Sequence, residues 1–135
     1  FAMPLPVSAI VMTGKITSHK DLEVWRKSMD LVEDVYKLTQ NYPKEELYGI
    51  TSQIRRATVA IPLNITEGFH RHHIKEYVQF LYIAKGSAAE LETLLEITDR
   101  LRFNHAANIE GIQRLLAEIL RMLSGLISKL KLIKN

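Results

Sequence analysis

The chain has 135 residues, 47% of them hydrophobic and 24% charged, which suits one globular domain with a single core. Aromatic residues make up only 7%, and 6 glycines and 4 prolines are too few for an architecture of short strands and turns. The absence of cysteine excludes disulfides and thiolate metal sites and suits a cytoplasmic protein, and the net charge of +3 is no nucleic-acid signature by itself.

The first 17 residues are expected to form an N-terminal tail outside the fold. They carry no charge before Lys15 and no apolar periodicity, and Met12 would serve as a native start. The tail is therefore interpreted as disordered or derived from cloning, and the folded domain is assigned to residues 18–135.

The first helix is predicted to begin at Ser18, because Ser18 and Asp21 have the spacing of a capping box. It ends before Pro43, since the residue that precedes a proline avoids the helical conformation. Two apolar rows at alternating spacings of three and four predict a face wide enough for a bundle core and a further surface. The rows are Leu22, Trp25, Met29, Val32 and Tyr36, and Val24, Ser28, Leu31, Val35 and Leu38.

The second helix is predicted to start after residues 43–46, to kink at Pro62 and to end at Gly68. Its apolar row is Leu47, Ile50, Ile54, Ala57 and Ile61. The third helix is predicted to begin within residues 72–75 and to end before the loop at 102–105. Small residues around Gly86 suggest that a neighbouring helix approaches closely there. Its core row is Tyr77, Leu81, Ala84, Ala88, Leu91, Leu95 and Thr98.

The fourth helix is predicted to start near Asn108 and is apolar over an arc broader than three partner helices usually cover. This surplus suggests burial against another subunit. Four helices with short connections predict an all-α fold, an antiparallel up-down-up-down four-helix bundle. The apolar residues of this helix are Ile109, Ile112, Leu115, Leu116, Ile119, Leu120, Leu123, Leu126, Ile127 and Leu130.

One pair of residues has the spacing of a metal site, Glu67 and His70, with His72 and His73 nearby. A di-metal bundle needs two such Glu-x-x-His motifs and a glutamate from each of two other helices, so a structural turn is the favoured interpretation. No nucleophile elbow, phosphate-cradling loop or dinucleotide fingerprint is present either. The chain is therefore predicted to be non-enzymatic and to use no metal or cofactor, with a metal-dependent enzyme as the least favoured hypothesis.

Basic residues suggest a surface for phosphates. Successive segments of the chain alternate in charge sign, which suits neighbouring helices or subunits, although ordinary scatter on solvated faces explains it as well. In an antiparallel bundle the basic residues of the second and fourth helices would form a positive stripe, and repetition around a ring would strengthen binding by avidity. The candidates are Arg55, Arg71, Lys75, Arg114, Arg121, Lys129, Lys131 and Lys134.

Five polar residues near the predicted core face form a second group. We expect a structural polar network in which Arg56 and Glu90 are partly buried as a pair, which sets helix register at little net energy. The alternative is that they are exposed. The group consists of Gln53, Arg56, Asn64, Glu67 and Glu90.

The stretches DLEVW (21–25), YGITSQIRRA (48–57), IPLNITEG (61–68) and YVQFLYIAKGSAAELE (77–92) resemble the 23S rRNA intervening sequence protein family, over residues 18 to about 130. The resemblance implies a small cytosolic bacterial protein that forms a ring-shaped homopentamer. Some relatives are encoded inside rRNA insertions, and a similar protein assists retroelement reverse transcriptases through a basic surface. Ala60 and Thr66 depart from the family's usual Ser and Ala, which puts a polar contact in the second helix in doubt.

The leading hypothesis is thus a non-enzymatic, homo-oligomeric scaffold or accessory factor that associates with RNA or DNA. The alternative is a protein-interaction adaptor whose partner, a reverse transcriptase or another protein, covers the apolar surface of the fourth helix. No membrane partner is expected, because no apolar run is long enough to span a bilayer.

Overall fold

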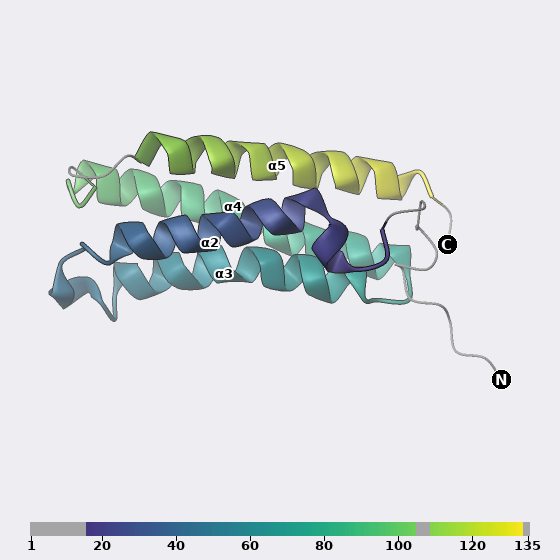
Figure 1. Ribbon diagram of the computed structural model, residues 1–135, viewed down its shortest axis with the longest axis horizontal. Coiled ribbons are helices and arrows are strands. Elements are labelled where there is room, and N and C mark those ends of the chain that lie inside the picture. Colours follow the sequence, from purple (N-terminus) through teal and green to yellow (C-terminus); the bar gives the residue numbers. More distant parts are fainter. Residues whose placement is uncertain (1–15, 105–108, 134–135) are drawn as a thin grey trace.

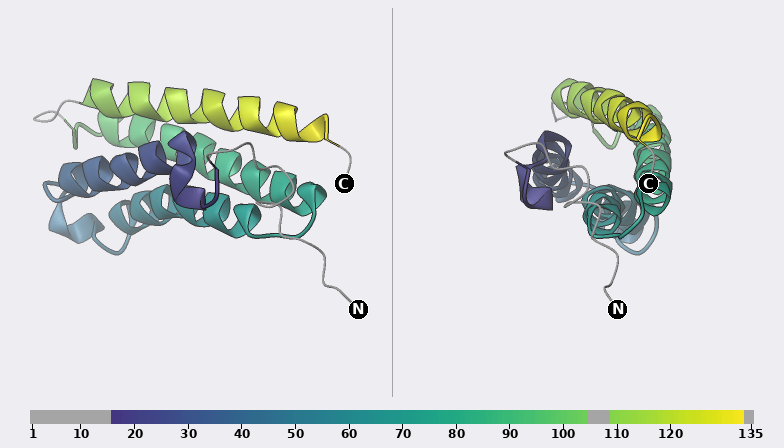
Figure 2. Two further views of the ribbon diagram at one scale, coloured as in Figure 1. Left: turned by 45° about the vertical axis from the view of Figure 1, so that its right-hand side comes forward. Right: turned by 90° about the vertical axis from the view of Figure 1, so that its right-hand side faces the viewer.

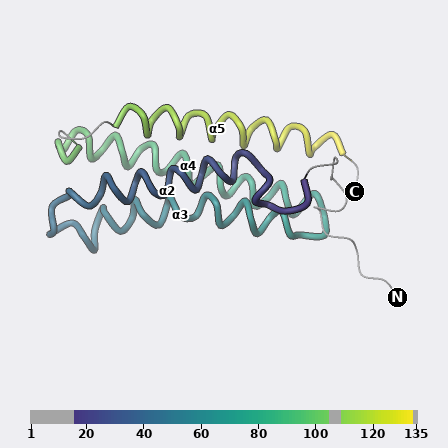
Figure 3. The backbone as a smooth tube through the Cα atoms, in the orientation of Figure 1, coloured from purple at the N-terminus to yellow at the C-terminus, as the bar shows by residue number. Residues whose placement is uncertain are grey.

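The computed structural model describes residues 16–104 and 109–133. This part of the chain contains four α-helices, α2 (Glu23–Thr39), α3 (Ile50–Phe69), α4 (Ile74–Arg100) and α5 (Ile109–Lys131), two short 3-10 turns, η1 (His19–Asp21) and η2 (Lys44–Glu46), and no strand. The helices alternate in direction along one long axis (Figure 1; the backbone path is clearest in Figure 3). Each helix packs against its neighbours in the chain, and α5 closes the bundle against α2 (Figure 2). The predicted all-α, antiparallel four-helix bundle is confirmed.

The first helix begins later than its capping box suggests. The box forms, because the Ser18 hydroxyl accepts from the Lys20 N–H and the Asp21 carboxylate accepts from the Ser18 N–H, but it caps η1, and α2 starts only at Glu23. Of the predicted tail, Ile16 and Thr17 lie in the described residues. Ile16 packs against the core and Thr17 donates to Asp21, so the folded part begins at least two residues before position 18.

The core is built from one inward row on each helix. The predicted row of α4 is confirmed, since every one of its members is buried. On α2 the row that contains Leu31 and Val35 faces the core, whereas Met29 and Tyr36 of the other row are exposed. The second predicted helix also starts late, at Ile50, and its expected core residue Leu47 is exposed.

The predicted surplus of apolar surface on the fourth helix is wrong in position. Six residues of α5 are buried, and flanking ones such as Leu115, Leu120 and Leu126 are packed against the core at intermediate exposure. Most of the large exposed apolar side chains lie on α2, α3 and α4 or beside the ends of α3 and α4, and two more, Leu132 and Ile133, follow the end of α5. The first group consists of Met29, Tyr36, Leu47, Tyr48, Leu63, Tyr82, Ile83, Ile97 and Leu101.

Two glycines have roles that differ from the predicted ones. Gly68 does not end α3, which continues to Phe69; it is buried, and a Cβ there would lie 2.8 Å from Phe80 Cβ and 2.9 Å from Tyr77 Cδ1. Gly68 therefore permits a close approach of α3 to α4 at this point. Gly86 has no heavy atom within 4 Å of its would-be Cβ, so the close packing predicted around it does not involve Gly86. Pro62 is buried inside α3, and the helix continues through it as predicted.

A buried polar cluster joins two connections at one end of the bundle. The Tyr42 hydroxyl, in the α2–α3 connection, is within hydrogen-bond distance of Thr98 Oγ1 at 3.1 Å and of the Asn104 side-chain oxygen. Asn104 also donates to Thr98 at 3.0 Å. Burial raises the pKa of Tyr42, so its hydroxyl stays protonated and this link between the connections persists through neutral pH.

Candidate interaction surfaces

Lys75 and Lys131 come together at one end of the bundle. Lys75 lies in the first turn of α4 and Lys131 in the last turn of α5, and both line a shallow groove of about 360 Å³ between the two helices. The Lys131 ammonium donates to the Tyr82 hydroxyl at 3.2 Å and lies 5.6 Å from the centre of the Tyr82 ring. Both lysines are exposed, and neither forms an ion pair with a described acid.

Two other basic candidates lie at the same end of the bundle. Arg71, in the α3–α4 connection, is ion-paired with Glu67 and stacks over Phe80 at 4.6 Å from the ring centre. Lys129 lines a separate groove between α2 and α5, with Met122 and Leu126. Part of the charge of Arg71 is thus neutralised, while Lys129 stays exposed.

The remaining basic candidates do not extend this group into one stripe. Arg55 lies near the opposite end, where its Nε donates to Thr39 at 2.9 Å. Arg114 is 4.0 Å from Glu110 at the start of α5, Arg121 is exposed in the middle of that helix, and Lys134 lies outside the described residues. The candidates therefore do not form the predicted stripe. Four of them, Arg71, Lys75, Lys129 and Lys131, form a basic end of the bundle, and the others are scattered.

The polar network predicted for the core is not formed in the protomer. Arg56 and Glu90 are both exposed, as are Gln53 and Glu67, and the described ion pairs do not join Arg56 to Glu90. Asn64 is partly buried and donates to the carbonyl of Ala60 at 2.8 Å. These residues lie outside the apolar faces of their helices, Gln53, Arg56, Asn64 and Glu67 on α3 and Glu90 on α4, so they are farther from the core than predicted.

The histidines of the α3–α4 end make a local contact. His70 Nε2 lies 2.9 Å from His19 Nδ1, and the His19 ring packs edge-on against Trp25 and Phe69. Burial, followed by the neighbouring His70, lowers the pKa of His19 and favours its neutral form. Glu67 is engaged by Arg71, and no group of three or more metal-ligating side chains occurs in residues 16–104 and 109–133.

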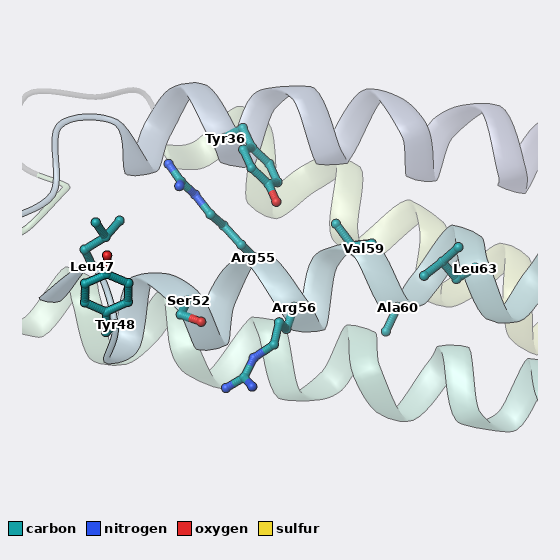
Figure 4. A pocket seen from close by; sticks show the side chains of 9 residues that line it. All are labelled: Tyr36, Leu47, Tyr48, Ser52, Arg55, Arg56, Val59, Ala60 and Leu63. Atoms are coloured by element: carbon teal, nitrogen blue, oxygen red, sulfur yellow. The ribbon is translucent and has the colours of Figure 1, made fainter.

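Sequence reasoning missed a groove along the outer side of α3. It has a volume of about 520 Å³ and runs from Tyr36 on α2 and Tyr48 before α3 to Leu63 (Figure 4). Tyr48 is 93% exposed and Leu63 62% exposed. Arg55 and Arg56 lie between these apolar side chains, with Arg55 reaching towards Tyr36, 4.6 Å from the ring centre, and Arg56 pointing the other way.

Such a groove suits an apolar surface that carries a carboxylate, because the arginines can pair with an acid while the flanking rings and aliphatic chains bury apolar atoms. The apolar periodicity places Tyr36 and Leu47 in core rows, whereas both are exposed and line this groove. The available signal was Tyr48 and Leu63, two large apolar residues that lie outside the predicted core row of α3.

Within the described residues, none of the helices combines the length and apolar character needed to cross a bilayer.

Comparison with known proteins identifies a family and similar solved structures. The family model described as 23S rRNA-intervening sequence protein matches residues 20–125. A crystal structure of a protein of unknown function from the S23 ribosomal protein family of Bacteroides thetaiotaomicron is similar, with 25% sequence identity and a TM-score of 0.71. The match covers 78% of this chain and 95% of that protein. No curated protein matches in sequence.

Proposed function

The chain belongs to the 23S rRNA-intervening sequence protein family, and from this premise we propose that it is a non-enzymatic, homo-oligomeric scaffold that associates with RNA or DNA. The observation that carries the proposal is the convergence of Lys75 and Lys131 on one groove between α4 and α5. The expected assembly is a homopentamer in the cytoplasm, and light scattering measures the number of copies.

The chemistry of this groove suits a phosphate backbone. Two exposed ammonium groups without described acidic partners are free to release counterions on binding phosphates. Tyr82 lies beside them and offers a ring on which a base could stack. Lys129 adds a further exposed cation at the same end, so a duplex or hairpin would meet several charges.

Charge reversal tests the proposal. The variant Lys75→Glu/Lys131→Glu is expected to bind a structured RNA at least about tenfold more weakly at low salt, and the slope of log affinity against log salt should fall by about 1 for each lysine. Lys37→Glu/Lys44→Glu is the matched control, because it makes the same change in net charge at the opposite end of the bundle. The proposal is wrong if the unaltered protein binds no RNA or DNA, if binding ignores salt, or if the control loses as much affinity.

A second candidate is the protein-interaction adaptor, which the groove along α3 favours. The exposed apolar residues of this groove and its two adjacent arginines would accept a protein partner, such as a reverse transcriptase. The partner would then bind at α3, and not at the fourth helix, where the sequence predicts it. A pull-down that returns one protein partner and is insensitive to nuclease would support the adaptor over the nucleic-acid scaffold.

A further inference from the structure

The outer surfaces of α3 and α4 leave large apolar side chains uncovered. Leu63 of α3 is 62% exposed and Tyr48, just before α3, 93%; Ile83 and Leu101, within and just after α4, are 50% and 54% exposed. Large apolar groups gathered on neighbouring helices mark a surface that another molecule covers.

The register of the two helices is fixed by Gly68, which lies against Tyr77 and Phe80. From this level Arg56 lies about three turns back along α3, and Glu90 about three turns forward along α4, so the two lie at about the same height in the antiparallel pair. Arg56 and Glu90 are both exposed.

The exposed apolar residues of the two helices also lie at matching heights. Leu63 and Ile83 each lie about one turn from the level of Gly68. Tyr48, just before α3, and Leu101, just after α4, lie beyond Arg56 and Glu90 at the other end of the two helices. Each helix, taken with the residue that flanks its far end, therefore presents the same order along the bundle: an apolar level, a charged level and a second apolar level, with opposite charges on the two helices at the middle level.

Small residues let the two surfaces meet closely. A side-chain carbon at Gly86 would have no heavy atom within 4 Å, and Ala89 beside it is exposed, so the outer face of α4 is flat near Glu90. The groove along α3 is lined by Ser52 and Ala60 on either side of Arg56. Small residues thus flank the charged residue on both surfaces, which lets the face of α4 approach the groove of about 520 Å³ closely at this level.

We propose that the groove along α3 of one protomer receives the outer face of α4 of a second copy of this chain, with Arg56 of the first paired to Glu90 of the second. A rotation about an axis parallel to the bundle keeps heights unchanged, so apolar levels meet apolar levels and Arg56 meets Glu90. The two surfaces differ, so the contact is head-to-tail and generates a ring where the rotation closes. This inference rests on the homo-oligomeric part of the proposed function and adds its interface.

The pair also accounts for the failed prediction of a buried Arg56–Glu90 pair within one bundle. Both residues are open to solvent in the protomer, and the same two residues become buried and paired when two protomers meet. A pair of this kind selects register and rejects slipped arrangements, because any other alignment leaves a charge against an apolar level.

Charge reversal measured by sedimentation or light scattering tests the contact. Arg56→Glu and Glu90→Arg are each expected to weaken self-association by at least about tenfold, and the double variant should regain it to within about threefold. Arg114→Glu, at an exposed position of α5 away from this contact, is the control and should change little. Circular dichroism checks the fold, which is expected to stay intact because the altered side chains are exposed.

Mixing the two single variants separates a contact between copies from one within a copy. Arg56→Glu carries an acid at both positions, and Glu90→Arg carries a base at both. When the two variants are mixed, each acidic position can face a basic position of the other variant. Association therefore returns only if positions 56 and 90 meet across copies. A five-membered ring keeps one like-charged contact in such a mixture and should not close fully.

Each result bears on a different claim. If the unaltered protein is a monomer, both the homo-oligomer and this interface are wrong. If it is an oligomer that both single variants leave unchanged, the interface is wrong and the proposed function stands. If the double variant recovers but the mixture does not, the pair acts within one protomer and the interface is again wrong.

Discussion

Replacing Gly68 by alanine is expected to destabilise the protein, although alanine favours helices. The added Cβ would lie 2.8 Å from Phe80 Cβ and 2.9 Å from Tyr77 Cδ1, distances at which something must move. Phe80 Cβ is fixed to the α4 backbone, so relief requires the two helices to separate. Overpacking of this kind costs about 1–3 kcal/mol, and the upper value applies here because no flexible side-chain end can give way. Alanine regains about 1 kcal/mol of helix propensity, which leaves a net loss of about 2 kcal/mol.

Thermal and urea unfolding at fixed protein concentration measure this loss, which should lower the Tm by about 6–8 °C for a chain of this size. Gly125→Ala is the matched control, because Gly125 lies inside α5 and a Cβ there would meet no heavy atom within 4 Å. It should stabilise the protein by about 1 kcal/mol. If Gly68→Ala is as stable as the unaltered chain, α3 and α4 do not approach as closely as the structure shows and the reasoning fails.

Three further predictions concern buried polar and titratable groups. Tyr42→Phe removes the hydroxyl that bonds Thr98 and Asn104, and urea unfolding should show a loss of about 1–2 kcal/mol. Burial raises the pKa of both Tyr42 and Tyr77 above 10.0, so these tyrosines ionise at lower pH in the unfolded chain than in the folded protein. The stability that is present below pH 10 should therefore fall as the pH rises beyond it, and urea midpoints in alkaline buffers measure this fall. The lowered pKa of His19 has the opposite effect: the stability that is present above pH 6.5, the pKa of an unfolded histidine, should be lost as the pH falls through the pKa of the folded protein. His19→Gln should reduce that loss in urea unfolding at a series of acid pH values.

The inner face of the bundle could be predicted from the sequence because it depends only on helix geometry. Tyr77, Leu81 and Ala84 recur at the spacing that brings one side of a helix towards the core, and all three are buried. The ends were less predictable. Ser18 and Asp21 do form a capping box, but a box specifies only the local turn, and here that turn is a 3-10 turn that precedes α2.

The outer face could not be predicted, because it depends on which helix lies beside which. The sequence shows that Gly68 and Gly86 are small, yet only the packing of α3 on α4 reveals that Gly68 is crowded and Gly86 open. In the same way, the broad apolar arc of α5 is covered by α2 and α4 and contributes little exposed surface. Tyr48 and Leu63, which fit no core row, are the residues left outside.

The interface and the basic end together yield one more prediction, because they occupy different parts of the bundle. Copies related by rotation about an axis parallel to the helices all direct the start of α4 and the end of α5 to the same rim, so Lys75 and Lys131 would repeat around one edge. Glu90→Arg makes the protein more positive, and charge alone predicts tighter RNA binding. Loss of the ring removes avidity and predicts weaker binding. We expect the weaker binding, by at least about tenfold in a filter-binding or anisotropy titration at low salt. Tighter binding by Glu90→Arg would mean that each protomer binds RNA alone and that the ring plays no part.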